Sequence, residues 1–121
     1  MDGKGNITTT APETMTFNCK NMNINVAQNM TTNVGMNKSD SIGMSHTETV
    51  GILKTLSVGT DFITNVMGKM VEYITGNKES SVEKDRQRVV NGENQIQSEK
   101  NYNVHSKTDF EGNAAEKSNF N

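Results

Sequence analysis

The sequence predicts an all-β protein, an intertwined homotrimeric triple-stranded β-helix (a β-prism needle) with octapeptide repeats. Three observations lead to this prediction: an eight-residue period of Val and Ile, glycines at fixed places in that period, and too few apolar residues for a globular core. A fixed period across most of a chain is typical of repeat architectures. The nine residues that define the period, called frame residues below, are the predicted structural core: Val26, Val34, Ile42, Val50, Val58, Val66, Ile74, Val82 and Val90.

The period of eight favours extended chain over helix. Coiled coils need a seven-residue period, because 3.5 residues match one helical turn, and eight does not fit. Eight is even, so in a strand that alternates sides all frame residues face the same way. The residues between them are mostly Thr, Asn, Ser, Gly and Met, which are poor material for a long helix. Each octad is therefore predicted to be a short strand followed by a corner.

The predicted corners are marked by glycine. Seven of the ten glycines follow a frame residue by one or two positions. Glycine adopts positive φ without steric cost, so its recurrence at fixed offsets predicts tight bends or close backbone approaches. These turn glycines are Gly35, Gly43, Gly51, Gly59, Gly68, Gly76 and Gly92.

The composition predicts that one chain cannot form a core alone. Leu, Ile, Val and Phe account for only 23 of 121 residues, and there is no Trp. This share is within the range typical of disordered chains, although the net charge of −2 is smaller than disorder usually carries. One aliphatic residue per octad fills only a thin interior, so we expect three copies to enclose it around a common axis.

The chain is predicted to have three parts. Residues 1–23 form an N-terminal lead-in segment, residues 24–110 the octad-repeat β-helix, and residues 111–121 a polar C-terminal tail or cap. After the last frame residue the aliphatic positions move to Ile96 and Val104, two places earlier than the frame, which is occupied there by Ser98 and Ser106. This shift predicts a change of register that preserves inward–outward parity.

Two stretches of the repeat resemble the needle region of VgrG proteins, the spikes of type VI secretion systems, which are similar to the central spikes of contractile phage tails. These stretches are Thr31–Asp61 and Asn65–Glu79. The family has octapeptide repeats of the form Val-Gly-x-Asn or Val-x-Gly, which match Val34-Gly35-Met36-Asn37 and Val66-Met67-Gly68. The flanks Asp2–Met15 and Gly112–Phe120 also resemble C-terminal regions of Bacteroidetes VgrG proteins, so the likeness covers nearly the whole chain.

The resemblance implies a rigid trimeric needle in a cell-puncturing device. In that family an upstream globular region docks the spike on the tube and hub proteins, and a small PAAR-type tip protein with effectors sits at the distal end. The start Met1-Asp2-Gly3 suggests a fragment of a longer protein, although a short natural protein also fits. The competing interpretation is a trimeric stalk of a phage tail fibre or adhesin that positions a receptor-binding tip.

The sequence favours a structural protein over an enzyme. It has no nucleophile elbow, phosphate loop or paired carboxylates, so we expect no catalysis and no cofactor; a lyase would need clustered acidic and basic residues on one exposed face. We also expect no metal centre, because His46 and His105 lie 59 positions apart without a His-x-His pair; a ring of three His46 copies is the alternative. The single Cys19 is expected to be a free thiol.

The position four before each frame residue holds mostly long side chains, some of them basic. They are either a grip for an anionic partner or a solvated surface, and the second is the ordinary case. Asp40, Glu48 and Glu72 are expected to form surface ion pairs with them, so the mixed charge disfavours nucleic acid as a partner. These positions are Met22, Met30, Lys38, His46, Lys54, Phe62, Met70, Lys78 and Arg86.

The sequence contains no apolar stretch of 18 residues and no signal peptide, which predicts no stable insertion into a membrane. We therefore expect assembly in the cytoplasm, followed by secretion or injection into a target cell by a contractile machine.

Overall fold

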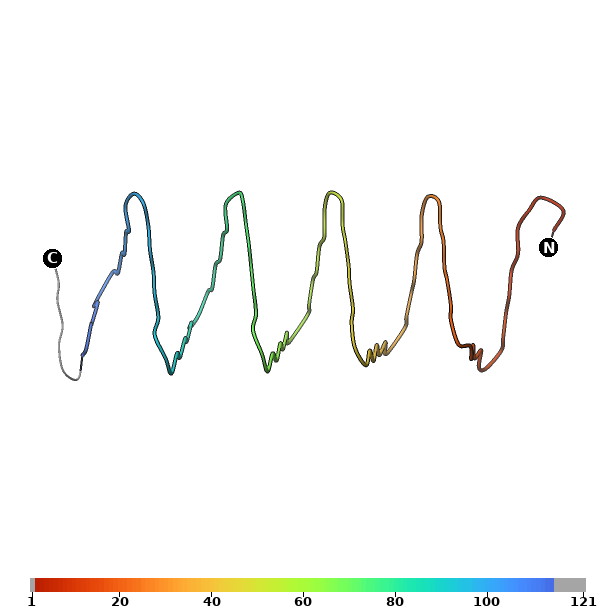
Figure 1. Ribbon diagram of the computed structural model, residues 1–121, viewed down its shortest axis with the longest axis horizontal. Helices are drawn as coiled ribbons and strands as arrows, with labels where there is room; N and C mark the ends of the chain where they lie inside the picture. The colour runs from red at the N-terminus through yellow and green to blue at the C-terminus, as the bar shows by residue number, and fades with distance from the viewer. Residues whose placement is uncertain (1, 115–121) are drawn as a thin grey trace. The chain divides into compact units, whose positions relative to one another are not determined.

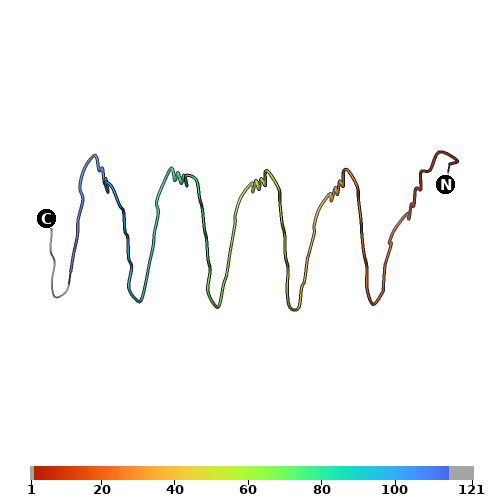
Figure 2. The same ribbon diagram turned by 45° about the horizontal axis from the view of Figure 1, so that its top comes forward.

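The computed structural model describes residues 2–114, which form neither a helix nor a β-strand. Figures 1 and 2 draw this part of the chain as a plain trace in both views, without a coiled ribbon or an arrow. Stretches of extended chain alternate with short bends. Residue 1 and residues 115–121 are outside the described part, and so is most of the tail that was predicted for residues 111–121.

The predicted fold class is therefore wrong: the chain is neither an all-β protein nor a β-helix. A β-strand exists only where its backbone pairs with a neighbouring segment. Among residues 2–114 the one backbone–backbone hydrogen bond joins the Asp2 amide to the Asn6 carbonyl, at 3.3 Å, in a local turn. The sequence period predicts where the chain is extended and where it bends, but it supplies no pairing partner within the chain.

The bends recur every eight residues from residue 27 to residue 108. Nine of them come directly after a frame residue, as the predicted corners do. The bends occupy residues 27–28, 35–36, 43–44, 51–52, 59–60, 67–68, 75–76, 83–84, 91–92, 99–100 and 107–108. The eight-residue period of the sequence is thus also the period of the backbone.

The bends keep their spacing where the aliphatic positions shift. The last two bends follow Ser98 and Ser106, the residues at the unshifted frame positions, and do not follow Ile96 and Val104. The Ser98 hydroxyl donates to the Asn101 carbonyl at 3.3 Å, and the Ser106 hydroxyl donates to the Asp109 carbonyl at 2.8 Å. The predicted change of register is therefore not seen in the backbone, where serine hydroxyls span these two bends.

Every residue in the described part of the chain is exposed to solvent. No Cα atom there lies within 8 Å of another that is twelve or more positions away. The accessible surface is 14580 Å², about twice the ~6,500 Å² that a compact protein of 13.3 kDa exposes. The predicted core residues consequently form no core within one chain.

The chain divides into two units, Met1–Asp61 and Phe62–Asn121. The first unit contains the five regular bends from 27–28 to 59–60, preceded by bends at residues 3–5, 12–13 and 20. The second unit contains the six regular bends from 67–68 to 107–108. Both units are therefore built from the same octad.

Candidate assembly surface

The nine frame residues have nearly the same environment in every octad. Their exposed fractions span only 43–51%, whereas Ile52 and Met67, which lie within bends, are fully exposed at 101% and 106%. Since no distant part of the chain approaches them, their partial cover comes from residues close in sequence. The octad thus presents one aliphatic side chain per repeat in a constant, half-covered position. We call these nine side chains the frame surface.

The seven turn glycines all lie within bends, but the expected conformational reason does not apply to them. None has a positive φ, and a Cβ atom added to any of them would have no neighbour within 4 Å. Within one chain, each could be replaced by alanine without strain. Positive φ occurs instead at Gly3 and Gly5, at 80° and 88°.

Gly3 and Gly5 belong to a hydrogen-bonded turn near the N-terminus. The Asp2 carboxylate accepts hydrogen bonds from the Lys4 amide at 2.9 Å, the Asn6 amide at 3.3 Å and the Asn6 side-chain amide at 3.0 Å. These bonds lower the pKa of Asp2, with the Asn6 side chain contributing most and the Lys4 amide next. The turn fixes the local geometry of residues 2–6, outside the regular bends.

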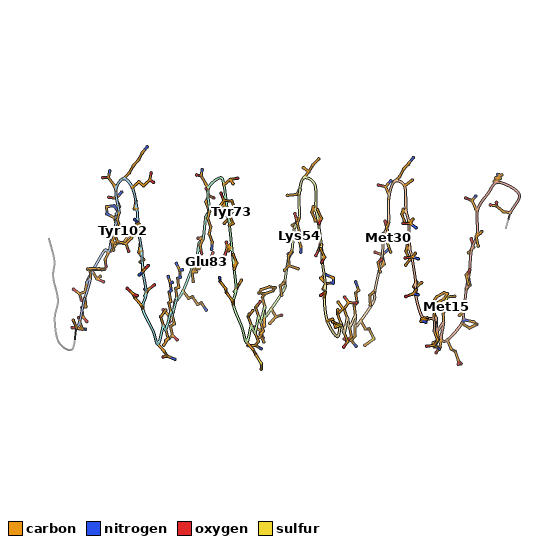
Figure 3. All side chains as sticks on the ribbon, viewed as in Figure 1. Met15, Met30, Lys54, Tyr73, Glu83 and Tyr102 are labelled. Carbon is orange, nitrogen blue, oxygen red and sulfur yellow. The ribbon has the colours of Figure 1, made fainter. Side chains whose placement is uncertain are left out.

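The expected surface ion pairs are present at Asp40, Glu48 and Glu72. The lysine Nζ atom lies 3.7 Å from a carboxylate oxygen in the pair Lys38–Asp40, 2.8 Å in Lys54–Glu48 and 2.9 Å in Lys78–Glu72. The pKa of Glu48 is lowered, mainly by the hydrogen bond from Lys54, then by the charge of Lys54, and to a smaller extent by the charge of His46. In Figure 3 the side chains stand along the open trace, Lys54 and Met30 among them.

The described residues contain no enclosed chemical site. The structure has no pocket there, and no three His, Cys, Asp or Glu residues gather in a group that could hold a metal ion. Cys19 is exposed as a free thiol, and His46 acts through its charge on Glu48 of the Glu48–Lys54 ion pair. The chemistry that this part of the chain offers is therefore that of an extended surface.

Within residues 2–114 the structure contains no helix that is both long and apolar enough to span a membrane.

Ser98 and Ser106 are structural residues that the sequence reasoning read only as signs of a lost register. Their spacing of eight, in phase with the frame residues, was the signal that could have identified them as continued bends.

No protein-family model, curated protein or solved structure matches the chain.

Proposed function

We propose that this protein is structural: one of three identical chains in the needle of a contractile injection spike of the type VI secretion class. The observation that carries the proposal is the bend that follows a half-covered Val or Ile every eight residues, in a chain whose residues 2–114 pack nowhere on one another. The likeness of the octads to VgrG needle repeats supports the choice of machine. The described residues form no pocket in which a small molecule could bind and react.

The physical support for partners comes from comparing the entropy cost of ordering the chain with the free energy gained by burying apolar surface. Fixing the backbone of one residue costs about 1–2 kcal/mol, so an ordered chain of this length carries a cost on the order of 100 kcal/mol or more. Burial of apolar surface is the main term that offsets such a cost, and the described residues contain no buried side chain. Other chains packed against this regular conformation would supply the burial that it lacks, which supports the proposed assembly.

Copies of the same chain are the simplest partners for a repeating surface. A frame surface with one aliphatic side chain per octad is matched in spacing by the same surface on another copy. Each side chain is narrow, so a few copies around a common axis cover it with little polar surface trapped inside. We propose three copies, with a PAAR-type tip protein and effectors at the distal end and tube and hub proteins upstream.

The proposed role requires assembly in the cytoplasm and expulsion by a contractile machine. Passage through an envelope would then be mechanical, by a stiff body, and would need no insertion of the chain into the lipid. The repeated octad suits such a body, because each repeat adds length without adding a new kind of contact.

The first test is the mass of the purified protein in solution. Sedimentation equilibrium should give a trimer of about 40 kDa, three times the chain mass of 13.3 kDa. A folded monomer at micromolar concentration would contradict the proposal.

The second test addresses the machine in the source cell. Cells that carry Val90→Asp in place of the native gene should release less tube protein into the medium, whereas cells with Val89→Asp should release the native amount. Val89 is 87% exposed and Val90 is 43% exposed. Both variants replace a valine by an aspartate, but only Val90→Asp changes the frame surface. Normal release of tube protein with Val90→Asp would contradict the role in secretion. Fibre genes beside this gene, without sheath or tube genes, would favour the alternative of a tail-fibre or adhesin stalk.

A further inference from the structure

Two ion pairs occupy the same places in different octads. Glu48 and Lys54 lie two residues before and four residues after a frame residue, and so do Glu72 and Lys78. Their Nζ–Oε distances are 2.8 and 2.9 Å, although the pairs belong to different units of the chain. Because the geometry is nearly identical, a Glu and a Lys at these two places meet across the bend in both octads.

The same two places carry matched chemistry in other octads. In most octads that lie within one unit, the residues two before and four after the frame position form one of two combinations. Either one is acidic and the other basic, or both are apolar. Asp40 and His46 occupy the same two places, although the Asp40 carboxylate pairs with Lys38, at 3.7 Å, on its own side of the bend. The apolar sets are Ile24 with Met30, Ile96 with Tyr102, and Val104 with Phe110.

No octad within a unit places like charges at these two positions. The remaining sets combine a neutral residue with a basic or apolar one. The residues of the apolar sets are also 49–68% exposed, less than the bend residues Ile52 and Met67. Matched chemistry at two positions six residues apart is expected if the bend brings them together in every repeat.

The described regular bends have no backbone hydrogen bond of their own, and serine hydroxyls span only the last two of them. Among residues 2–114 the only backbone–backbone hydrogen bond is the one between Asp2 and Asn6, which lies outside the regular bends. The turn glycines do not hold the bends through positive φ either. The side chains that flank a bend are therefore the contacts available to hold it.

We propose that, where the residues two before and four after a frame position are chemically matched, they form a cross-bend pair that stabilises the bend of that octad. The pair is ionic where the sequence supplies an acid and a base, and apolar where it supplies two apolar side chains. In the two C-terminal octads the apolar pair acts together with the hydroxyls of Ser98 and Ser106. The effect on assembly rests on the proposed homotrimer, whereas the contact across the bend belongs to each chain.

The test is a charge swap in the full chain. Lys54→Glu places two carboxylates across one bend and should lower the thermal midpoint of the assembled protein, by roughly 1–5 °C. The swap Glu48→Lys with Lys54→Glu restores opposite charges and should return the midpoint close to that of the native chain. The matched control is Lys69→Glu, which changes the net charge equally outside a cross-bend pair.

Equal midpoints for Lys54→Glu and Lys69→Glu would overturn the proposal, and so would a swap that is no more stable than the single variant. A second measurement needs no assembly: the carboxyl titration of Glu48 followed by ¹³C NMR. Its pKa should be lower in the native chain than in Lys54→Met, and identical values would also overturn the pairing. If the native chain is monomeric but its Glu48 titration responds to Lys54, the homotrimer fails while the cross-bend pair stands.

Discussion

Replacing Val90 by Asp should prevent or strongly weaken assembly, whereas the same change at Val89 should be tolerated. The two residues are adjacent and chemically identical, but Val90 belongs to the frame surface and Val89 does not. The exposed fraction of Val90 is 43%, against 87% for Val89. The pair therefore isolates the direction of the side chain from every other property.

The size of the effect follows from the exposed part of Val90. Full burial of a Val side chain contributes about 1.5–3 kcal/mol, so covering the 43% that is still exposed contributes about 0.6–1.3 kcal/mol per chain. Three copies lose about 2–4 kcal/mol, which corresponds to a roughly 30- to 1,000-fold weaker assembly. Three carboxylates brought close together raise the loss further, because each must be desolvated next to like charges.

Sedimentation equilibrium across a range of protein concentrations measures this difference directly. The native chain and Val89→Asp should be trimeric at concentrations where Val90→Asp is monomeric. Equal association constants for the two variants would show that the frame surface does not face a partner, and the proposed arrangement of the copies would be wrong.

Three further predictions concern the assembled protein. Residues 24–92 should resist limited proteolysis, with early cuts confined to the N-terminal lead-in segment and to residues 111–121; mass spectrometry showing early cuts between Val34 and Ile74 would exclude a rigid needle. Assembly should weaken as the pH falls below 4.5, because the pKa of Glu48 is lowered by its ion pair with Lys54. The ion pair stabilises the folded chain above the ordinary carboxyl pKa and is lost when Glu48 is protonated, so unchanged sedimentation at pH 3 would contradict this prediction. Gly51→Ala should leave the thermal midpoint unchanged or slightly raised, since a Cβ there meets no atom of the chain within 4 Å, and a large fall would reveal a close contact from a partner.

The sequence was sufficient to place the corners of the repeat. Val26 and the later frame residues precede nine of the regular bends at the predicted spacing. The strands between the corners could not be established in the same way, because a strand depends on a neighbouring backbone that the period does not specify. An alternating apolar pattern identifies extended chain, and the extended stretches of residues 2–114 pair with no other stretch.

The surface positions were predictable only in part. The ion pairs at Asp40, Glu48 and Glu72 were expected and are present. The sequence did not predict that two of these pairs lie across a bend at the same octad positions. That relation requires the backbone geometry, because residues six apart are not neighbours in a straight strand. The roles of Ser98 and Ser106 were missed for the same reason, since a hydroxyl that reaches a carbonyl three residues later is a property of the bend.

The exposed area also indicates how much of the chain must take part in assembly. Reducing 14580 Å² to the ~6,500 Å² of a compact protein of this mass would require each chain to cover about 8,000 Å². A standard interface covers only about 800 Å² per partner, roughly a tenth of that area. Contact at one end or at one octad would leave nearly all bends without cover and would not offset the entropy of ordering them. In the proposed assembly, partners would therefore lie along the whole repeat, which is the arrangement that a needle of parallel copies provides and that a linker between two docked domains does not.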